Sequence, residues 1–229
     1  MNPVRRIPRW EGVAVLLVTL ACWSSVPLFI RHLAAYVDHW SNNGWRYGAS
    51  ALFWLPAVLW ALGRGRLSRT IWKAALVPAL FNTGAQVAFT AAHEFVNPGL
   101  LTFGMRLQLV AVAAGAYLLF PAERATIASA RYLSGIALLV AGIAGVLLAG
   151  DGVLQGNSAH GVVLAVGAGL GYGAYGLSVR RFMTGFHPVY AFGVIALYTG
   201  AALLYFAVVA AAAALVRLAS ERWRRRILA

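Results

Sequence analysis

NPGLLTFGMRLQLVAVAAGAYLLFP, residues 97–121, is an apolar stretch interrupted by one permanent charge, Arg106. About 20 consecutive apolar residues allow a helix to cross the hydrocarbon core of a bilayer. A charge at the centre of such a helix costs roughly 2.5–3.5 kcal/mol on an insertion scale, and intramembrane charges usually face the protein interior or a wet cavity. The stretch therefore predicts a membrane-spanning helix whose arginine has a function.

The composition extends this interpretation to all 229 residues, of which 61% are hydrophobic and only 11% charged, with a mean hydropathy of +0.74. A soluble domain carries about 25% charged residues, so we expect an all-α integral membrane protein. The net charge of +13 is assigned to arginines that set topology, and no nucleic-acid partner is expected. The single cysteine, Cys22, excludes an intrachain disulfide and a cysteine-based metal cluster, and no cofactor is expected.

Seven apolar segments are candidate spans, and short polar connectors separate them. They are residues 11–30, 44–62, 74–93, 97–120, 131–149, 160–179 and 188–215. The first resembles a signal peptide, but its apolar stretch is longer than a usual signal core. Arg31 and His32 follow it in place of a cleavage site, so it is predicted to be a retained span.

Basic residues in the short loops predict the orientation, because cytoplasmic loops carry an excess of Lys and Arg. With a cytoplasmic N-terminus, the loops on the opposite side hold only Arg31 and Arg46. The cytoplasmic segments hold eleven basic residues: Arg5, Arg6, Arg9, Arg64, Arg66, Arg69, Lys73, Arg124, Arg131, Arg180 and Arg181. The segment 216–229 breaks the rule, because it carries five arginines where an outside tail is expected.

A weak internal repeat appears when the chain is shifted by 149 residues. The shift superimposes Gly12 on Gly161, Trp23 on Tyr172 and Arg31 on Arg180. Five predicted spans separate the two copies, so the second copy must cross the membrane in the opposite sense. Inverted repeats of this kind are common in secondary transporters.

Four segments together resemble the EamA-type carriers of the drug/metabolite transporter superfamily. They are LACWSSVPLFIRH (20–32), WRYGASALFWLPAVLW (45–60), FPAERATIASARYLSGIALLVAGIAGVLLAG (120–150) and GAGLGYGAYGLSVRRF (167–182). The first resembles the family's tryptophan motif, and the third resembles its loop before the fifth helix, with Glu123 and Arg124. The resemblance implies ten helices arranged as two inverted five-helix repeats. Matched to that plan, 11–150 is a first repeat, 160–215 a partial second repeat and 216–229 a basic tail, so the chain is interpreted as C-terminally truncated.

The polar residues inside the predicted spans are the candidate solute-binding residues. Arg106 and Thr102 lie one turn apart, and Asn82 and Gln86 are four residues apart on one helix face. Trp23 and the repeat-related Tyr172 and Tyr175 would flank a central cavity. For Arg106 the alternative is a bond to carbonyls at a helix break or on a neighbouring helix. For Asn82 and Gln86 it is a hydrogen bond to a neighbouring helix, and for the aromatic residues it is ordinary packing.

These residues predict a secondary carrier in a bacterial inner membrane that moves an amino acid or organic anion by alternating access. The predicted spans place no Asp or Glu at mid-membrane, so the buried charge is positive. The alternative is a non-transporting protein, or a half-carrier that forms a homo-oligomer or needs a partner chain. An enzyme is not expected, because the sequence has no HExxH, no GxSxG and no pair of intramembrane aspartates.

Overall fold

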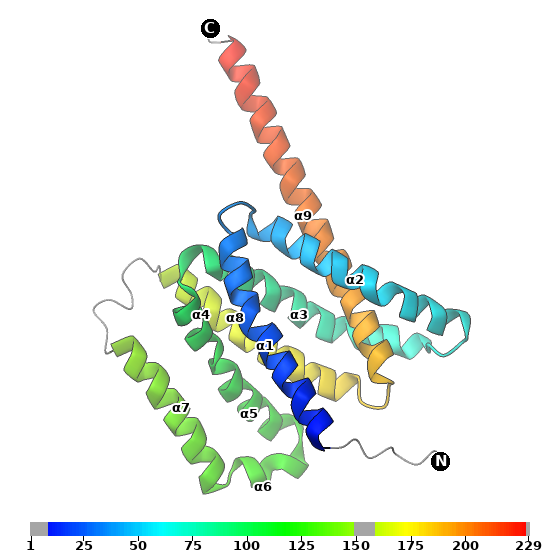
Figure 1. Ribbon diagram of the computed structural model, residues 1–229, viewed down its shortest axis with the longest axis vertical. Coiled ribbons are helices and arrows are strands. Elements are labelled where there is room, and N and C mark those ends of the chain that lie inside the picture. Colours follow the sequence, from blue (N-terminus) through cyan, green and yellow to red (C-terminus); the bar gives the residue numbers. More distant parts are fainter. Residues whose placement is uncertain (1–8, 149–158, 228–229) are drawn as a thin grey trace.

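The computed structural model describes residues 9–148 and 159–227, and within these ranges it contains helices and no strand (Figure 1). The α-helices, with one 3₁₀ turn η1, are α1 Arg9–Leu33, α2 His39–Gly63, α3 Arg69–Phe95, α4 Pro98–Met105, α5 Leu107–Leu119, η1 Pro121–Glu123, α6 Arg124–Ile127, α7 Ala130–Leu148, α8 Ala159–Phe182 and α9 Pro188–Ile227.

Five helical segments of the described chain are long and apolar enough to cross a membrane: α1, α3, α4 with α5, α8 and most of α9. The pair formed by η1–α6 and α7, bent by 71°, would make a sixth. The prediction of an all-helical membrane protein is confirmed, whereas the seven-span repeat architecture stays a prediction. The segment predicted as the second span forms α2, whose first turns carry Ser41, Asn42, Asn43 and Arg46 and so lower its hydropathy.

The bundle centre is formed by α2 against α9 and by α3 against α8, with α5 also on α8. Leu101, Phe89 and Ala168 are buried in one apolar cluster, and Ile71 and Val194 in another. α1 and α7 lie at the periphery, and the C-terminal half of α9 extends beyond the bundle (Figure 1). At 1.5 Å per residue, the 40 residues of α9 span about 60 Å, twice the hydrocarbon thickness of about 30 Å.

α1 and α8 run in opposite directions, as an inverted repeat requires. Arg31, near the end of α1, donates from Nη1 to the carbonyl of His93 at the end of α3. At the same end, the ring of His160 at the start of α8 lies 5.1 Å from the ring of Phe95. α1 therefore ends where α8 begins (Figure 1).

Asp38 fixes the start of α2 by capping it. Its Oδ1 accepts hydrogen bonds from the backbone N–H groups of Trp40 (2.9 Å) and Ser41 (3.1 Å), and its Oδ2 accepts one from the Ser41 hydroxyl (2.7 Å). Partial burial acts to raise the pKa of Asp38, but these hydrogen bonds outweigh it and leave the pKa below its usual value of 3.8. The helix consequently starts at His39, five residues before the predicted span.

We expect Asp38→Ala to destabilise the protein by about 0.5–2 kcal/mol, the usual cost of losing an N-cap. Because folding lowers the pKa of Asp38, its stabilising effect is complete above the unfolded value and is lost as pH falls through the folded value. Thermal melting of wild type and Asp38→Asn across pH 3–7 in detergent measures this, because asparagine keeps the cap but does not titrate. Equal pH dependence of the two proteins would contradict the assignment.

Candidate functional site

The interior of the bundle contains polar side chains that a lipid-facing helix would not carry. Within the described ranges, the buried polar residues are Asn42, Asn43, Asn82, Gln86, Thr90, His93, Ser178 and Thr199. Most come from α2 and α3. Polar groups inside a membrane bundle either bond helices together or mark a solute pathway, so their individual partners decide between the two roles.

One group of these residues ties helices together. Asn43 Nδ2 donates to the carbonyl of Gln86 (3.3 Å), and the Thr90 hydroxyl donates to Asn43 Oδ1 (2.9 Å), which joins α2 to α3. Asn82 Nδ2 donates to the hydroxyl of Thr199 (3.2 Å), which joins α3 to α9. Asn82 therefore has a hydrogen-bond partner on a neighbouring helix.

The Asn82–Thr199 hydrogen bond is expected to contribute roughly 0.6 kcal/mol, the average found for such bonds in a membrane bundle. A double-mutant cycle with Asn82→Ala and Thr199→Val measures this as a coupling in unfolding free energy. The control is the same cycle with a substitution at Thr83 in place of Asn82. The Thr83 hydroxyl bonds within its own helix, because it donates to the carbonyl of Ala79 (2.8 Å). Strictly additive effects of the Asn82 and Thr199 substitutions would show that the bond contributes nothing.

A second group surrounds Arg46, which lies in α2 with its Nη1 buried and without a hydrogen-bond partner in the described structure. Its guanidinium carbon lies 5.7 Å from the ring centroid of Tyr47. Arg46 lies one turn after Asn43, which hydrogen-bonds Gln86 and Thr90 of α3. α8 packs against the same part of α3, where Gly171 meets Ala85. The partly buried Arg46 cation therefore lies on the face of α2 that meets α3, in the region where α8 also packs.

Gln86 and His93 add unpartnered acceptors to this region. Gln86 is buried, at 7% relative exposure, and its Oε1 has no hydrogen-bond partner in the described structure. His93 Nδ1 lies 2.8 Å from the carbonyl of Phe89, which places the proton on Nδ1 and leaves the buried Nε2 as an unpartnered acceptor. We call Arg46, Tyr47, Gln86, His93 and Tyr172 the Arg46 cluster.

The other predicted site residues lie elsewhere. Arg106 is exposed at the junction between α4 and α5, where its N–H bonds to the carbonyl of Phe103 rather than continuing the α-helical pattern. The hydroxyl of Thr102 donates to the carbonyl of Pro98 in its own helix (2.7 Å), and Trp23 is 75% exposed. Tyr175 packs against the apolar cluster around Ile71.

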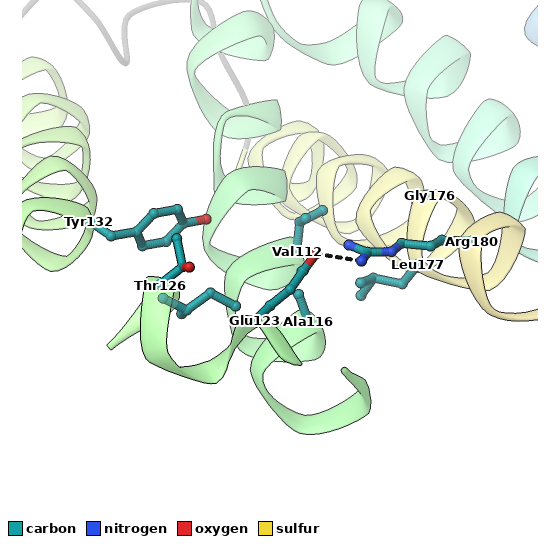
Figure 2. A pocket seen from close by; sticks show the side chains of 9 residues that line it. Val112, Ala116, Glu123, Thr126, Tyr132, Gly176, Leu177 and Arg180 are labelled. Carbon is teal, nitrogen blue, oxygen red and sulfur yellow. Dashed lines mark ion pairs between the residues drawn. The ribbon is translucent and has the colours of Figure 1, made fainter. Parts of the chain in front are cut away.

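A pocket of about 500 Å³ opens at the other end of α8 (Figure 2). An ion pair between Glu123, in η1, and Arg180, near the end of α8, lies along it. The guanidinium carbon of Arg180 is also 4.2 Å from the ring centroid of Phe120. The pocket is lined by Val112, Ala116, Glu123, Thr126, Ile127, Tyr132, Gly176, Leu177 and Arg180.

A sequence model of the EamA-like transporter family matches residues 10–148, which run from α1 to the end of α7. The chain belongs to the EamA-like transporter family. The resemblance predicted from the sequence motifs is thereby confirmed. Comparison with curated proteins and with solved structures found no match.

Membership makes this EamA-like protein a multi-pass membrane transporter of the drug/metabolite type, a class of transporters rather than enzymes. In the described residues, no group of three or more His, Cys, Asp or Glu side chains is placed to hold a metal ion. The interior chemistry therefore centres on the Arg46 cluster.

The count of basic loop residues assigns Arg46 to an outside loop, whereas in the structure of this EamA-like protein it lies within α2. A pattern in the sequence could have identified it. Asn42, Asn43 and Arg46 are spaced three and four residues apart, which puts them on one face of a helix. A polar face on an otherwise apolar helix indicates an interior environment.

Proposed function

We propose that the protein is a secondary carrier that moves a small metabolite, such as an amino acid or organic anion, across a bacterial inner membrane. The observation that carries this proposal is the Arg46 cluster, a charged group with unpartnered polar atoms inside an apolar bundle. Intramembrane ionisable residues that face the bundle interior typically mark a solute pathway. The family membership supports the same function.

The proposed mechanism is alternating access, in which one repeat rocks against the other about a site near the midplane. The Arg46 cluster draws α2 and α3 from the first proposed repeat, 11–150, and α8 from the partial second, 160–215. A solute bound in the cluster would therefore contact both moving parts. The opposite directions of α1 and α8 support this arrangement.

The Glu123–Arg180 ion pair is proposed to close the pathway at its cytoplasmic end when the N-terminus is cytoplasmic. Glu123 lies in η1, after α5 of the first proposed repeat, and Arg180 lies near the end of α8 in the second. The ion pair therefore bridges the two proposed repeats. Both side chains are partly solvent-exposed, and exposed ion pairs are weak. Such a pair can open and reform in each transport cycle.

Gln86 and Tyr172 are proposed as solute contacts because they belong to the Arg46 cluster. Asn82 and Tyr175 lie on the same two helices and are proposed as contacts that change when these helices move. For Arg106, Thr102 and Trp23 the proposed solute-facing role rests on the sequence alone.

Uptake by purified protein in liposomes tests this function. Amino acids, organic anions, neutral sugars and lipophilic cations are presented separately, and counterflow is measured against protein-free liposomes. We expect saturable counterflow of at least one amino acid or organic anion. Exclusive transport of lipophilic cations, or no transport of any class by protein shown to be folded, would overturn the proposal.

A further inference from the structure

We infer that the Arg46 cluster binds a small carboxylate that carries a second, hydrogen-bond-donating group, as amino acids and hydroxy acids do. Arg46 takes the carboxylate, and Gln86 Oε1 and His93 Nε2 take the donor. This inference rests on the proposed carrier function and adds the chemical class of the solute and the atoms that recognise it.

The first part follows from the charge of Arg46. A guanidinium stays protonated in proteins. Arg46 is partly buried, and burial makes a charge costly unless it is paired. The ion pairs found in the described structure are His39–Glu94 and Arg180–Glu123, so no carboxylate there neutralises Arg46. Its buried Nη1 has no acceptor. A carboxylate ligand supplies both the charge and the acceptor, through a charge-assisted hydrogen bond.

The second part follows from the acceptors beside that charge. Gln86 Oε1 and His93 Nε2 are buried and lack a donor. A simple carboxylate offers only acceptors and would leave both atoms unsatisfied, which costs free energy in a buried site. An ammonium, amide or hydroxyl on the same solute would donate to one of them. The unpartnered atoms are therefore complementary to a ligand that carries both groups.

Two tyrosines complete the site. Tyr47 lies beside the Arg46 guanidinium, with 5.7 Å between its ring centroid and Cζ, within the range of a cation–π contact. Tyr172 reaches the cluster from α8, and its ring lies 6.0 Å from that of Phe89, one turn from Gln86 on α3. A solute held here would bridge α2–α3 and α8.

The experiment compares probes that share one skeleton: alanine, lactate, propionate and ethylamine, with phenylalanine, phenyllactate, phenylpropionate and phenethylamine as a larger set. Binding to purified protein is measured by calorimetry and transport by counterflow. The variants are Arg46→Gln, Arg46→Lys and Gln86→Leu. Arg131→Gln is the matched control, because Arg131 is an exposed arginine at the start of α7.

We expect the amino acid or hydroxy acid of one set to bind at least about tenfold more tightly than the simple acid, and the amine not to bind. Arg46→Gln should weaken binding of every carboxylate at least about tenfold, with partial recovery in Arg46→Lys. Gln86→Leu should reduce the preference for the second group without weakening the simple acid, because it leaves His93 Nε2 as the remaining acceptor. Arg131→Gln should match wild type.

The outcomes separate the two levels of the account. Transport of neutral sugars or amines with unchanged affinity in Arg46→Gln would overturn this inference and leave the carrier function standing. Absence of transport in folded wild-type protein would overturn the carrier function itself. If Arg46→Gln fails to fold, Gln86→Leu and the probe preference of wild type still decide, because a simple acid that binds as well as its amino and hydroxy analogues contradicts the site.

Discussion

Gly169→Ala is expected to destabilise the protein by about 1–3 kcal/mol, whereas Gly167→Ala should leave it nearly unchanged. A Cβ at position 169 would lie 2.9 Å from the carbonyl oxygen of Met105 and 3.0 Å from its Cα. These are backbone atoms of α4 at the point where α8 crosses it, so relief requires the two helices to separate. Overpacking of this kind costs about 1–3 kcal/mol.

Gly167 is the matched control because a Cβ there would meet nothing within 4 Å. Both residues lie in α8 within one turn of each other, so helix propensity changes equally in the two variants. Unfolding in a mixed detergent, followed by circular dichroism, gives the difference in unfolding free energy. Equal stability of Gly169→Ala and Gly167→Ala would show that α8 and α4 do not approach as closely as described.

Arg180→Glu is expected to lower the rate of solute counterflow roughly tenfold, since it places two carboxylates where an ion pair now lines the pocket. The double variant Glu123→Arg with Arg180→Glu restores opposite charges in exchanged positions. It should recover most of the lost rate. Recovery distinguishes an electrostatic contact from a general requirement for arginine at position 180.

Arg181→Glu is the control for this pair, because it makes the same charge change at the neighbouring, exposed position. We expect it to transport at close to the wild-type rate. An Arg180→Glu variant as active as Arg181→Glu would contradict a role for the pair in closing the pathway. Failure of the exchanged double variant to recover would do the same.

Much of the fold was predictable from the sequence, because helical membrane spans depend on local hydropathy. The apolar segments predicted for residues 74–93 and 160–179 lie within α3 and α8. The start of α2 was predicted less well, because the Asp38 cap extends the helix through a polar segment. The added turn places Asn42 and Asn43 on the same helix face as Arg46, which changes the interpretation of Arg46 from loop anchor to partly buried helix residue.

The site was predictable only where one helix determines it. The spacing of Asn82 and Gln86 puts both on one helix face, and the structure buries both residues. The partner of Asn82, however, is Thr199 on α9, more than a hundred residues away. Such partners depend on long-range packing and leave no local pattern. Arg106 is a different case. Hydropathy identifies it as a charge within an apolar stretch, but hydropathy does not predict the helix break between α4 and α5 that leaves its side chain exposed.

The glycines of α8 make the same point about packing. Gly167, Gly169, Gly171 and Gly173 include two small-xxx-small pairs, a spacing that favours close helix contact. In the structure Gly169 meets Met105, Gly171 meets Ala85 and Gly173 meets Ala111, while Gly167 faces open space. Which small residue is required thus depends on where the neighbouring helices cross.

The central claim is that the Arg46 cluster lies on a water-filled solute pathway, and cysteine accessibility tests it most directly. The chain has one cysteine, Cys22, so Cys22→Ala provides a background for single cysteines at position 86, in the cluster, and at position 80. Leu80 lies on the same helix and is 71% exposed on the apolar surface.

Only a thiolate reacts with a charged thiosulfonate reagent, and a thiol in hydrocarbon does not ionise. The account predicts rapid modification of Gln86→Cys in liposomes and none of Leu80→Cys. Equal resistance of both cysteines, in protein shown to be folded, would contradict it.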